Sequence, residues 1–466
     1  MSPRVLGLAA SLVLLASCAA TGPRGPAPQP LSADGLAGVA AGATTPAVGE
    51  RWWSAFGDAQ LDALIDEGLA KSPTVASAAA RLAGAESLAR AARGARLPST
   101  DLSGTVERQR LSEKGLYPPP YGGSTLNLGQ VGLDFSYEID LLGRVRNSIA
   151  ASDSASTAAR DDLAAARLGL AAGIARTYLK LNRNYALEET LTAAAARRRD
   201  LLALTEQRVS AGLDTQLEIE EARATLAAAE ADLASAAEER ALLANELAAL
   251  VGAGPGRGAA LTRPTSTTPV AIAMPDELPA NLVARRPDIA ADRARVESAA
   301  AEVRIARAAF YPNVNLSAFA GFQSIALGSL ISNGTRSWNA GPAVSLPLFF
   351  TDKLRGQLGA RDADYASAVA KYNGTVLDAF HEVADAVASL RYLDREQAAN
   401  HDAVAALDHA YQLALERYRA GLANYLTVLI AEENLLAQRR VGVDLDARRA
   451  DLVVALFRAL GGGFTA

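Results

Sequence analysis

The 466-residue chain has few of the side chains that usually carry enzyme chemistry. One cysteine excludes an intrachain disulfide and a cysteine-based metal site, and there are only three histidines. After His381-Glu382, Asp385 stands where a zinc-protease helix would place its second histidine. His401 and His409 could share a helix face, but two ligands without a third make a poor site. We therefore predict no metal site, no cofactor and no enzyme activity.

The chain also lacks a basic excess, and it has no membrane-length apolar run after its N-terminal segment. Its formal net charge is −5, which does not indicate a nucleic-acid partner. No later stretch has the ~18 consecutive apolar residues of a membrane helix. If the chain enters a membrane, it must do so through strands or through an attached lipid.

The N-terminus is typical of a secreted protein. Residues 1–17 combine Arg4 with the apolar stretch VLGLAASLVLLAS, as in a signal peptide. The sequence LASC at 15–18 resembles a bacterial lipobox, so we predict that Cys18 becomes the first mature residue and carries a covalent lipid. Ala19 follows it, where an Asp would favour the inner membrane, and this predicts the outer membrane. Residues 18–50, rich in Pro, Gly and Ala, predict a flexible linker.

The remaining sequence contains two copies of one pattern. Without gaps, Pro73 aligns with Pro287 and Pro98 with Pro312, and further on the AGL at 211–213 aligns with the AGL at 420–422. The offset changes from 214 to 209 between Pro98 and Arg146, which predicts a loop of different length there. We therefore expect a first repeat at 51–252, a linker at 253–274 and a second repeat at 275–463.

Each copy includes very long helical stretches. Residues 121–254 and 348–466 contain no proline and are dominated by strong helix formers. A helix from Arg144 to Ser210 would be about 100 Å long at ~1.5 Å per residue. Helices of that length require partners, and small alanines allow coiled-coil contact. Gly212 and Gly421 predict the turns at which one long helix reverses into the next.

Each copy also includes strand-like alternation. Val131, Leu133, Phe135, Tyr137 and Ile139 alternate with mostly polar residues. We expect β-hairpins within 99–140 and 313–349, with strands long enough to cross a bilayer. A soluble sheet packed on helices fits the same alternation. Four strands cannot close a transmembrane barrel, but three copies would supply twelve, enough for a lumen.

Several segments together resemble the TolC-like outer membrane efflux protein family, in its lipid-anchored, NodT-type branch. The resemblance runs from about Trp52 to Gly463 and is carried by WWSAFGDAQLDALI, SYEIDLLGRVR, RRPDIAADRARVESAAAEVRIARAAFYP, ERYRAGLANYLTVLIAEENLLAQR and RALGGG. It implies a mainly α fold with a small β part, in which a homotrimer builds an α-barrel from long helical hairpins. It also implies a transmembrane β-barrel with four strands per subunit.

The resemblance further implies a passive exit duct that works with a periplasmic adaptor protein and an inner-membrane pump. It assigns adaptor docking to the helix tips, at Gly212, Leu213, Gly421 and Leu422. It places a periplasmic constriction near the second tip, with the candidates Asp408, Tyr411, Leu415 and Glu416.

The predicted function is the outer-membrane channel of a tripartite efflux system for small toxic molecules, in contact with outer-membrane lipid and without nucleic acid. Two alternatives stay open. One is the outer-membrane duct of a type I protein secretion system, and the other is a lipid-anchored periplasmic coiled-coil scaffold without a pore.

Overall fold

The fold is described from a computed structural model. The structure describes residues 28–31, 39–40, 48–115, 117–265, 278–279, 285–347 and 351–465. Cys18 lies outside these residues, so its lipidation stays a prediction. The chain folds into two compact units. The strand unit includes Leu82–Ala159 and Asp292–Tyr372, and the helical unit includes Leu31–Arg81, Arg160–Ala291 and Asn373–Ala466.

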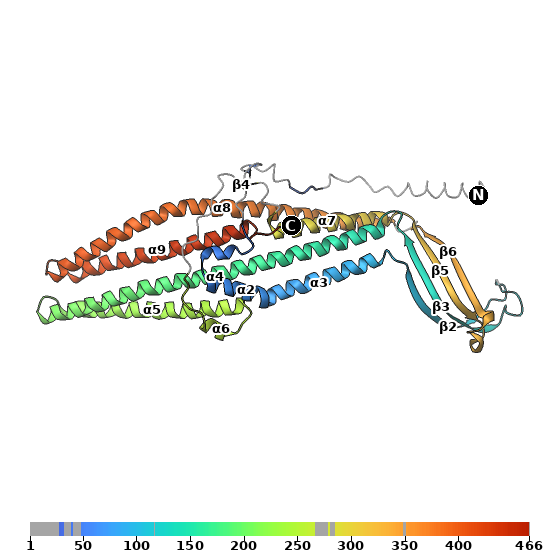
Figure 1. Ribbon diagram of the computed structural model, residues 1–466, viewed down its shortest axis with the longest axis horizontal. Coiled ribbons are helices and arrows are strands. Elements are labelled where there is room, and N and C mark those ends of the chain that lie inside the picture. Colours follow the sequence, from blue (N-terminus) through green and yellow to red (C-terminus); the bar gives the residue numbers. More distant parts are fainter. Residues whose placement is uncertain are drawn as a thin grey trace. The chain divides into compact units, whose positions relative to one another are not determined.

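The structure contains one order of long elements twice, two helices flanking a pair of strands and then a further helix (Figure 1). The first copy consists of α3 (Pro73–Gly94), β2 (Ser99–Arg110), β3 (Thr125–Ile139), α4 (Arg144–Ser210) and α5 (Gln216–Leu250). The second consists of α7 (Pro287–Ala308), β5 (Asn313–Ser324), β6 (Arg336–Ser345), α8 (Thr351–Arg419) and α9 (Tyr425–Ala459). The mainly helical fold and the 67-residue helix α4 are confirmed.

Smaller elements belong to the helical unit. The 3-10 helix η2 (Trp52–Phe56) precedes α2 (Ala59–Lys71), and α6 (Pro255–Ala259) follows α5. β1 (Val39–Ala40) pairs in parallel with β4 (Leu278–Pro279). Asp58 begins α2 as its N-cap, because its carboxylate accepts hydrogen bonds from the amides of Gln60 and Leu61.

Tryptophans near the start of the first repeat help to build the main hydrophobic core of the helical unit. Trp52 stacks on Phe457 of α9 with a 5.3 Å centroid separation, and Trp53 meets Trp52 edge-on. Leu61, Leu64, Ile174 and Leu247 are fully buried around them. Residues from the two ends of the sequence therefore share one core.

Arg286, in the segment RPD of the second repeat, is buried and holds three elements together. Its guanidinium donates to Asp288 at 2.7 and 3.1 Å, to Glu382 of α8 at 2.6 Å and to the Ala459 carbonyl at 3.4 Å. This arrangement gives the segment a structural role at the start of α7.

The four long strands form one antiparallel sheet in the order β2-β3-β5-β6 (Figure 1). Its central pairing joins the two repeats, with Leu133 opposite Ala320 and Tyr137 opposite Leu316. The register is continuous along all three strand pairs, so alternate residues keep to one face throughout. β2 and β6 are the two edges of the sheet.

Candidate functional site

One face of the sheet is apolar and exposed. The register aligns Leu102, Leu133, Ala320 and Trp338 in one row across the four strands. Trp338 is 79% exposed and Leu102 77%. Other large exposed side chains on this face are Val106, Tyr137, Ile139, Leu316 and Val344. A soluble protein rarely exposes so large an apolar surface, so this face is built to contact another apolar phase.

The opposite face is polar. All four carboxylates of the strands lie there, at Asp101, Glu107, Asp134 and Glu138. The Ser103 hydroxyl donates a hydrogen bond to Asp134. A sheet that is apolar on one side and polar on the other can separate lipid from water.

Phe319 is the one aromatic residue of the four strands on the polar face, and it is 6% exposed. Two glycines make room for its ring. A Cβ at Gly132 would lie 2.6 Å from the ring, and one at Gly321 would lie 2.8 Å from it. The ring therefore packs against the backbone at these two glycines and is shielded from solvent.

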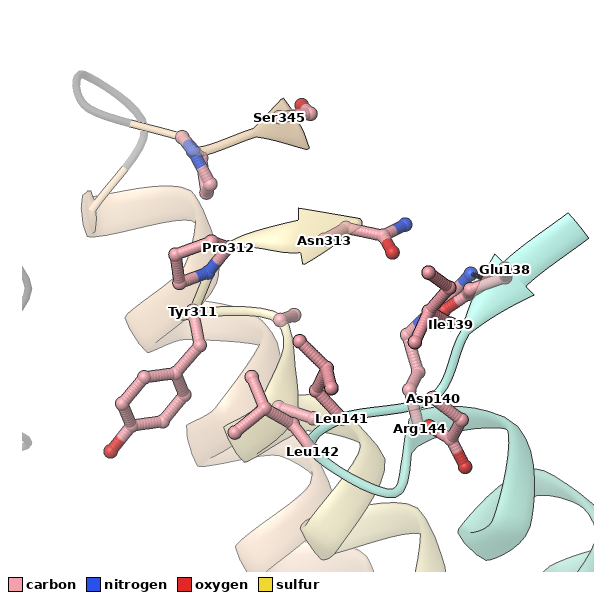
Figure 2. A pocket seen from close by; sticks show the side chains of 13 residues that line it. Glu138, Ile139, Asp140, Leu141, Leu142, Arg144, Tyr311, Pro312, Asn313 and Ser345 are labelled. Carbon is pink, nitrogen blue, oxygen red and sulfur yellow. Dashed lines mark hydrogen bonds and ion pairs between the residues drawn. The ribbon is translucent and has the colours of Figure 1, made fainter. Parts of the chain in front are cut away.

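A pocket of about 230 Å³ lies where the strands end near α4 and α7 (Figure 2). Leu141 and Leu142, in the loop after β3, contribute apolar side chains. The Asn313 side chain points toward Glu138. Arg144 forms an ion pair with Glu138. The Asp140 carboxylate accepts from the amide of Arg146 at 2.8 Å and so caps α4. The connection from β3 to α4 thus lines one side of the pocket.

The turn between α4 and α5 and the turn between α8 and α9 have the same geometry. Gly212 and Gly421 both have φ of 74°, in the left-handed region that favours glycine. The Leu213 amide donates to the Arg208 carbonyl at 2.9 Å, and the Leu422 amide to the Arg417 carbonyl at 2.8 Å. These are the bonds of a Schellman C-cap. The turn fixes both leucines in exposed positions, Leu213 at 62% and Leu422 at 69%.

A buried polar network joins the two helical hairpins, α4–α5 and α8–α9, next to these turns. The Tyr418 hydroxyl donates to Asp214 at 2.6 Å and lies 3.1 Å from the Thr205 hydroxyl. Arg208 donates to Asp214 at 2.7 Å and to the Tyr418 carbonyl at 2.7 Å, and its guanidinium lies 4.3 Å from the centre of the Tyr418 ring. We call these four residues the tip network. It ties α4 and the α4–α5 turn to the end of α8.

Protonation states in the tip network follow from these contacts. Burial acts to raise the pKa of Asp214, but hydrogen bonds from Arg208 and Tyr418 outweigh it and leave the pKa below its ordinary value. Burial and the hydrogen bond to Asp214 raise the pKa of Tyr418 to about 12. At neutral pH the network therefore holds a carboxylate, a guanidinium and a neutral phenol.

A second buried ion pair joins the hairpins further from the tips. Arg198 of α4 donates to one oxygen of Glu432 of α9 at 3.0 and 2.9 Å, and to the Thr225 carbonyl of α5 at 2.9 Å. Glu432 is 1% exposed. Three helices from both repeats are thus held by one guanidinium.

The structure separates the four constriction candidates. Tyr411 is only 4% exposed and packs with Leu201, Ala222 and Tyr418 in a core of the helical unit. This burial does not fit the prediction that Tyr411 lines a constriction, because a lumen-facing side chain is expected to be accessible in the single chain. Glu416 is exposed, and Leu415 is half-buried. Asp408 is also half-buried and pairs with Arg439 at 2.6 Å.

Sequence reasoning missed the tip network, although a signal for it exists. At the 209-residue offset, Thr205 aligns with Ala414, Asp214 with Ala423, and Tyr418 with Val209. Only Arg208 has a matching residue, Arg417, and that residue is exposed. Polar residues that break the internal repeat indicate a set of contacts that occurs once and is not duplicated by the repeat.

In the part of the chain that the structure describes, no three His, Cys, Asp or Glu side chains gather as metal ligands would. Among the same residues, no helix has the length and apolar character needed to cross a membrane.

Comparison with known proteins gives consistent matches. A sequence profile described as "Outer membrane efflux protein" matches residues 64–253 and 278–462. Outer membrane protein OprJ of Pseudomonas aeruginosa is 31% identical over 438 residues, covering 93% of this chain and 90% of OprJ. Fusaric acid resistance protein FusA of Burkholderia cepacia is 36% identical over 365 residues, covering 76% of this chain and 68% of FusA.

The crystal structure of the outer membrane protein VceC from Vibrio cholerae aligns with a TM-score of 0.84 at 40% identity. The alignment covers 90% of this chain and all of that one. The two blocks matched by the sequence profile correspond to the two copies of the internal repeat.

Proposed function

The chain belongs to the outer membrane efflux protein family, and we infer that it is the outer-membrane channel of a tripartite efflux system. In that role it is a passive exit duct for small toxic molecules from a Gram-negative cell. The observation that carries this function is the exposed apolar face of the β2-β3-β5-β6 sheet, opposite a face that holds all four strand carboxylates.

The open edges of the sheet support a homotrimer. In lipid, each unpaired backbone group of an edge strand costs several kcal/mol. Pairing β6 of one copy with β2 of the next removes both edges, and three copies give twelve strands around a lumen. The apolar face then meets lipid and the polar face meets the lumen. The long hairpins of the three copies would form the periplasmic α-barrel.

The helix tips would dock a periplasmic adaptor protein bound to an inner-membrane pump. Gly212 and Gly421 set two identical turns, and these turns expose Leu213 and Leu422. An exposed leucine at the end of a rigid turn suits a shallow apolar contact with a partner.

Asp408, Leu415 and Glu416 would lie near the closed periplasmic mouth. Threefold-repeated carboxylates there favour cations. Opening would require the hairpins to shift at their contacts, so the tip network would act as a latch within each subunit.

Cys18 would carry the lipid that anchors the mature N-terminus in the outer membrane. The sequence LASC at 15–18 supports this proposal.

Cysteine labelling on intact cells tests the membrane placement. Lys114 lies exposed in the loop between β2 and β3, and Ala211 lies exposed at the first helix tip. A membrane-impermeant maleimide should label Lys114→Cys on intact cells, and should label Ala211→Cys only after lysis. A protected residue 114 in intact cells would instead support a periplasmic scaffold without a pore.

A further inference from the structure

The charges of the four long strands are completely segregated between the two faces of the sheet. The four carboxylates lie on the polar face, as described above. The strands contain three arginines, Arg108, Arg110 and Arg336, and all of them lie on the apolar face. Cross-strand neighbours confirm the assignment, since Arg336 is opposite Phe322, and Arg108 lies two pairs along from Val106.

The arginines also gather at one end. Arg110 is the last residue of β2, and Arg336 is the first residue of β6, next to the loops 111–124 and 325–335. We call this the loop end of the sheet. At the opposite end, the same face carries uncharged residues at Thr100, Ile139, Val314 and Val344. A lipid-facing arginine costs far less near the membrane surface than at the midplane, which fits their position.

Partners within the chain leave these guanidiniums largely available. All three residues are exposed. Arg108 has no hydrogen-bonded or ionic partner among the described residues. Arg110 lies 3.6 Å from Glu113, with both side chains about seven-tenths exposed, which makes a weak surface pair. Arg336 donates to the amide oxygen of Asn333 at 3.0 Å, a neutral partner.

We propose that these three arginines form a binding site for the phosphate groups of a phosphorylated lipid at the outer surface of the membrane. The inference rests on the proposed function, because it needs the apolar face to lie against lipid. Guanidinium groups bind phosphate oxygens through paired hydrogen bonds, and apolar side chains next to them suit the acyl chains of the same molecule. Charge complementarity and the adjoining apolar surface therefore favour a lipid over a free anion.

Closing the sheet would complete the site. β2 and β6 are its two edges, so pairing between copies would bring Arg336 of one copy close to Arg108 and Arg110 of the next. Each junction would then hold one cluster of three guanidiniums, contributed by two subunits.

Native mass spectrometry of the purified full chain in detergent tests the proposal, with bis-phosphorylated lipid A as the probe. Replacing Arg108, Arg110 and Arg336 together by Gln should weaken lipid A binding by about fivefold for each guanidinium removed. The matched control is Arg96→Gln, an exposed arginine three residues before the other end of β2, which should bind as the wild type does. The triple Lys variant should retain most of the binding, because it keeps the charge.

Two ligand controls identify the source of the phosphate. Lipid A stripped of phosphate should bind the wild-type chain no better than it binds the triple Gln variant. Inorganic phosphate at millimolar concentration should not displace lipid A. Equal binding by the triple Gln variant, equal loss in Arg96→Gln, or displacement by inorganic phosphate would each overturn the proposal.

Conductance across a planar lipid film, measured on the same samples, distinguishes failure of the lipid site from failure of the proposed function. If the wild-type chain conducts and the triple Gln variant binds lipid A normally, only the lipid site is wrong. If the wild-type chain does not conduct, the proposed function itself is wrong.

Discussion

The phenol of Tyr418 donates a 2.6 Å hydrogen bond to the carboxylate of Asp214, and so connects the end of α8 to the turn between α4 and α5. Arg208 and Asp214 are each 9% exposed at the side chain, so this contact is shielded from water. A buried, charge-assisted bond between two hairpins is a physical link whose loss should loosen the tips.

Removing the phenolic hydroxyl of Tyr418 should weaken the tip network moderately. Tyr418→Phe deletes a hydrogen bond to a charged group, which is worth about 1.5–3 kcal/mol. Asp214→Ala should cost more, about 3–5 kcal/mol, because it leaves Arg208 buried without its carboxylate. Hydrogen exchange of the amides in 200–215 and 412–422 should speed up in that order. Glu220→Gln, which alters only an exposed ion pair with Arg223, should leave these rates unchanged. Unchanged exchange in Asp214→Ala would refute the link.

The tip network should be insensitive to pH across the neutral range. The pKa of Asp214 is lowered below 3.8, so its stabilising contribution is complete above that value and is lost as the pH falls below it. The pKa of Tyr418 is raised from 10 to about 12, so its contribution is present below pH 10 and is lost as the pH rises toward 12. The same amide exchange rates, corrected for intrinsic chemistry, should be flat between pH 5 and 9. A transition near pH 6 or 7 would contradict this assignment.

The Arg198–Glu432 pair should show strong coupling. Replacing either residue alone leaves a buried charge unpaired, at a cost of about 3–5 kcal/mol in the free energy of unfolding. Replacing both by Met should recover much of that loss, since well-packed apolar residues often substitute for a buried pair. A double-mutant cycle in chemical denaturation measures the coupling. Additive single losses would show that the pair does not act as a unit.

Phe319 needs the glycine on the neighbouring strand. Gly132→Ala would place a Cβ 2.6 Å from the Phe319 ring and 2.8 Å from the Ala320 carbonyl oxygen, so moving the ring alone cannot relieve the clash. We expect a loss of about 1–3 kcal/mol in the stability of the sheet. Gly341→Ala, on the same face of β6, meets nothing within 4 Å and is the matched control. Equal thermal stability of the two variants would refute the packing argument.

Exposed leucines at the helix tips should matter for transport and not for folding. Leu213→Asp combined with Leu422→Asp should leave the amount of folded protein unchanged, because both side chains point into solvent. In cells that also express the matching adaptor and pump, the double variant should raise dye accumulation to the level of a gene deletion. Leu88→Asp, at a residue that is 70% exposed on α3, serves as the control. Normal efflux by the tip variant would show that adaptor docking does not need these leucines.

The sequence predicts the long elements well because their signals are local. The absence of proline and the glycines at 212 and 421 mark where α4 ends and where the helices reverse. Strand faces follow from period-two alternation. β3 nevertheless begins at Thr125, six residues before the alternation from Val131 indicates. Leu126 and Leu128 occupy positions on the polar face there, so the alternation of apolar and polar residues is interrupted.

The sequence could not predict which face of each long helix is buried. Tyr411 is buried because helices from both repeats pack around it, and no local pattern in α8 indicates which face those helices cover. The tip network depends on the same packing, since Arg208 and Asp214 are more than 200 positions from Tyr418. Residues so far apart in the chain meet only in the folded protein.

The central claim is that several copies of this chain pool their strands to form one conduit. The most direct measurement joins the mass of the purified protein in detergent with ion conductance across a planar lipid film. We predict a trimer that produces stable conductance steps. A monomer that inserts without conducting would contradict the account.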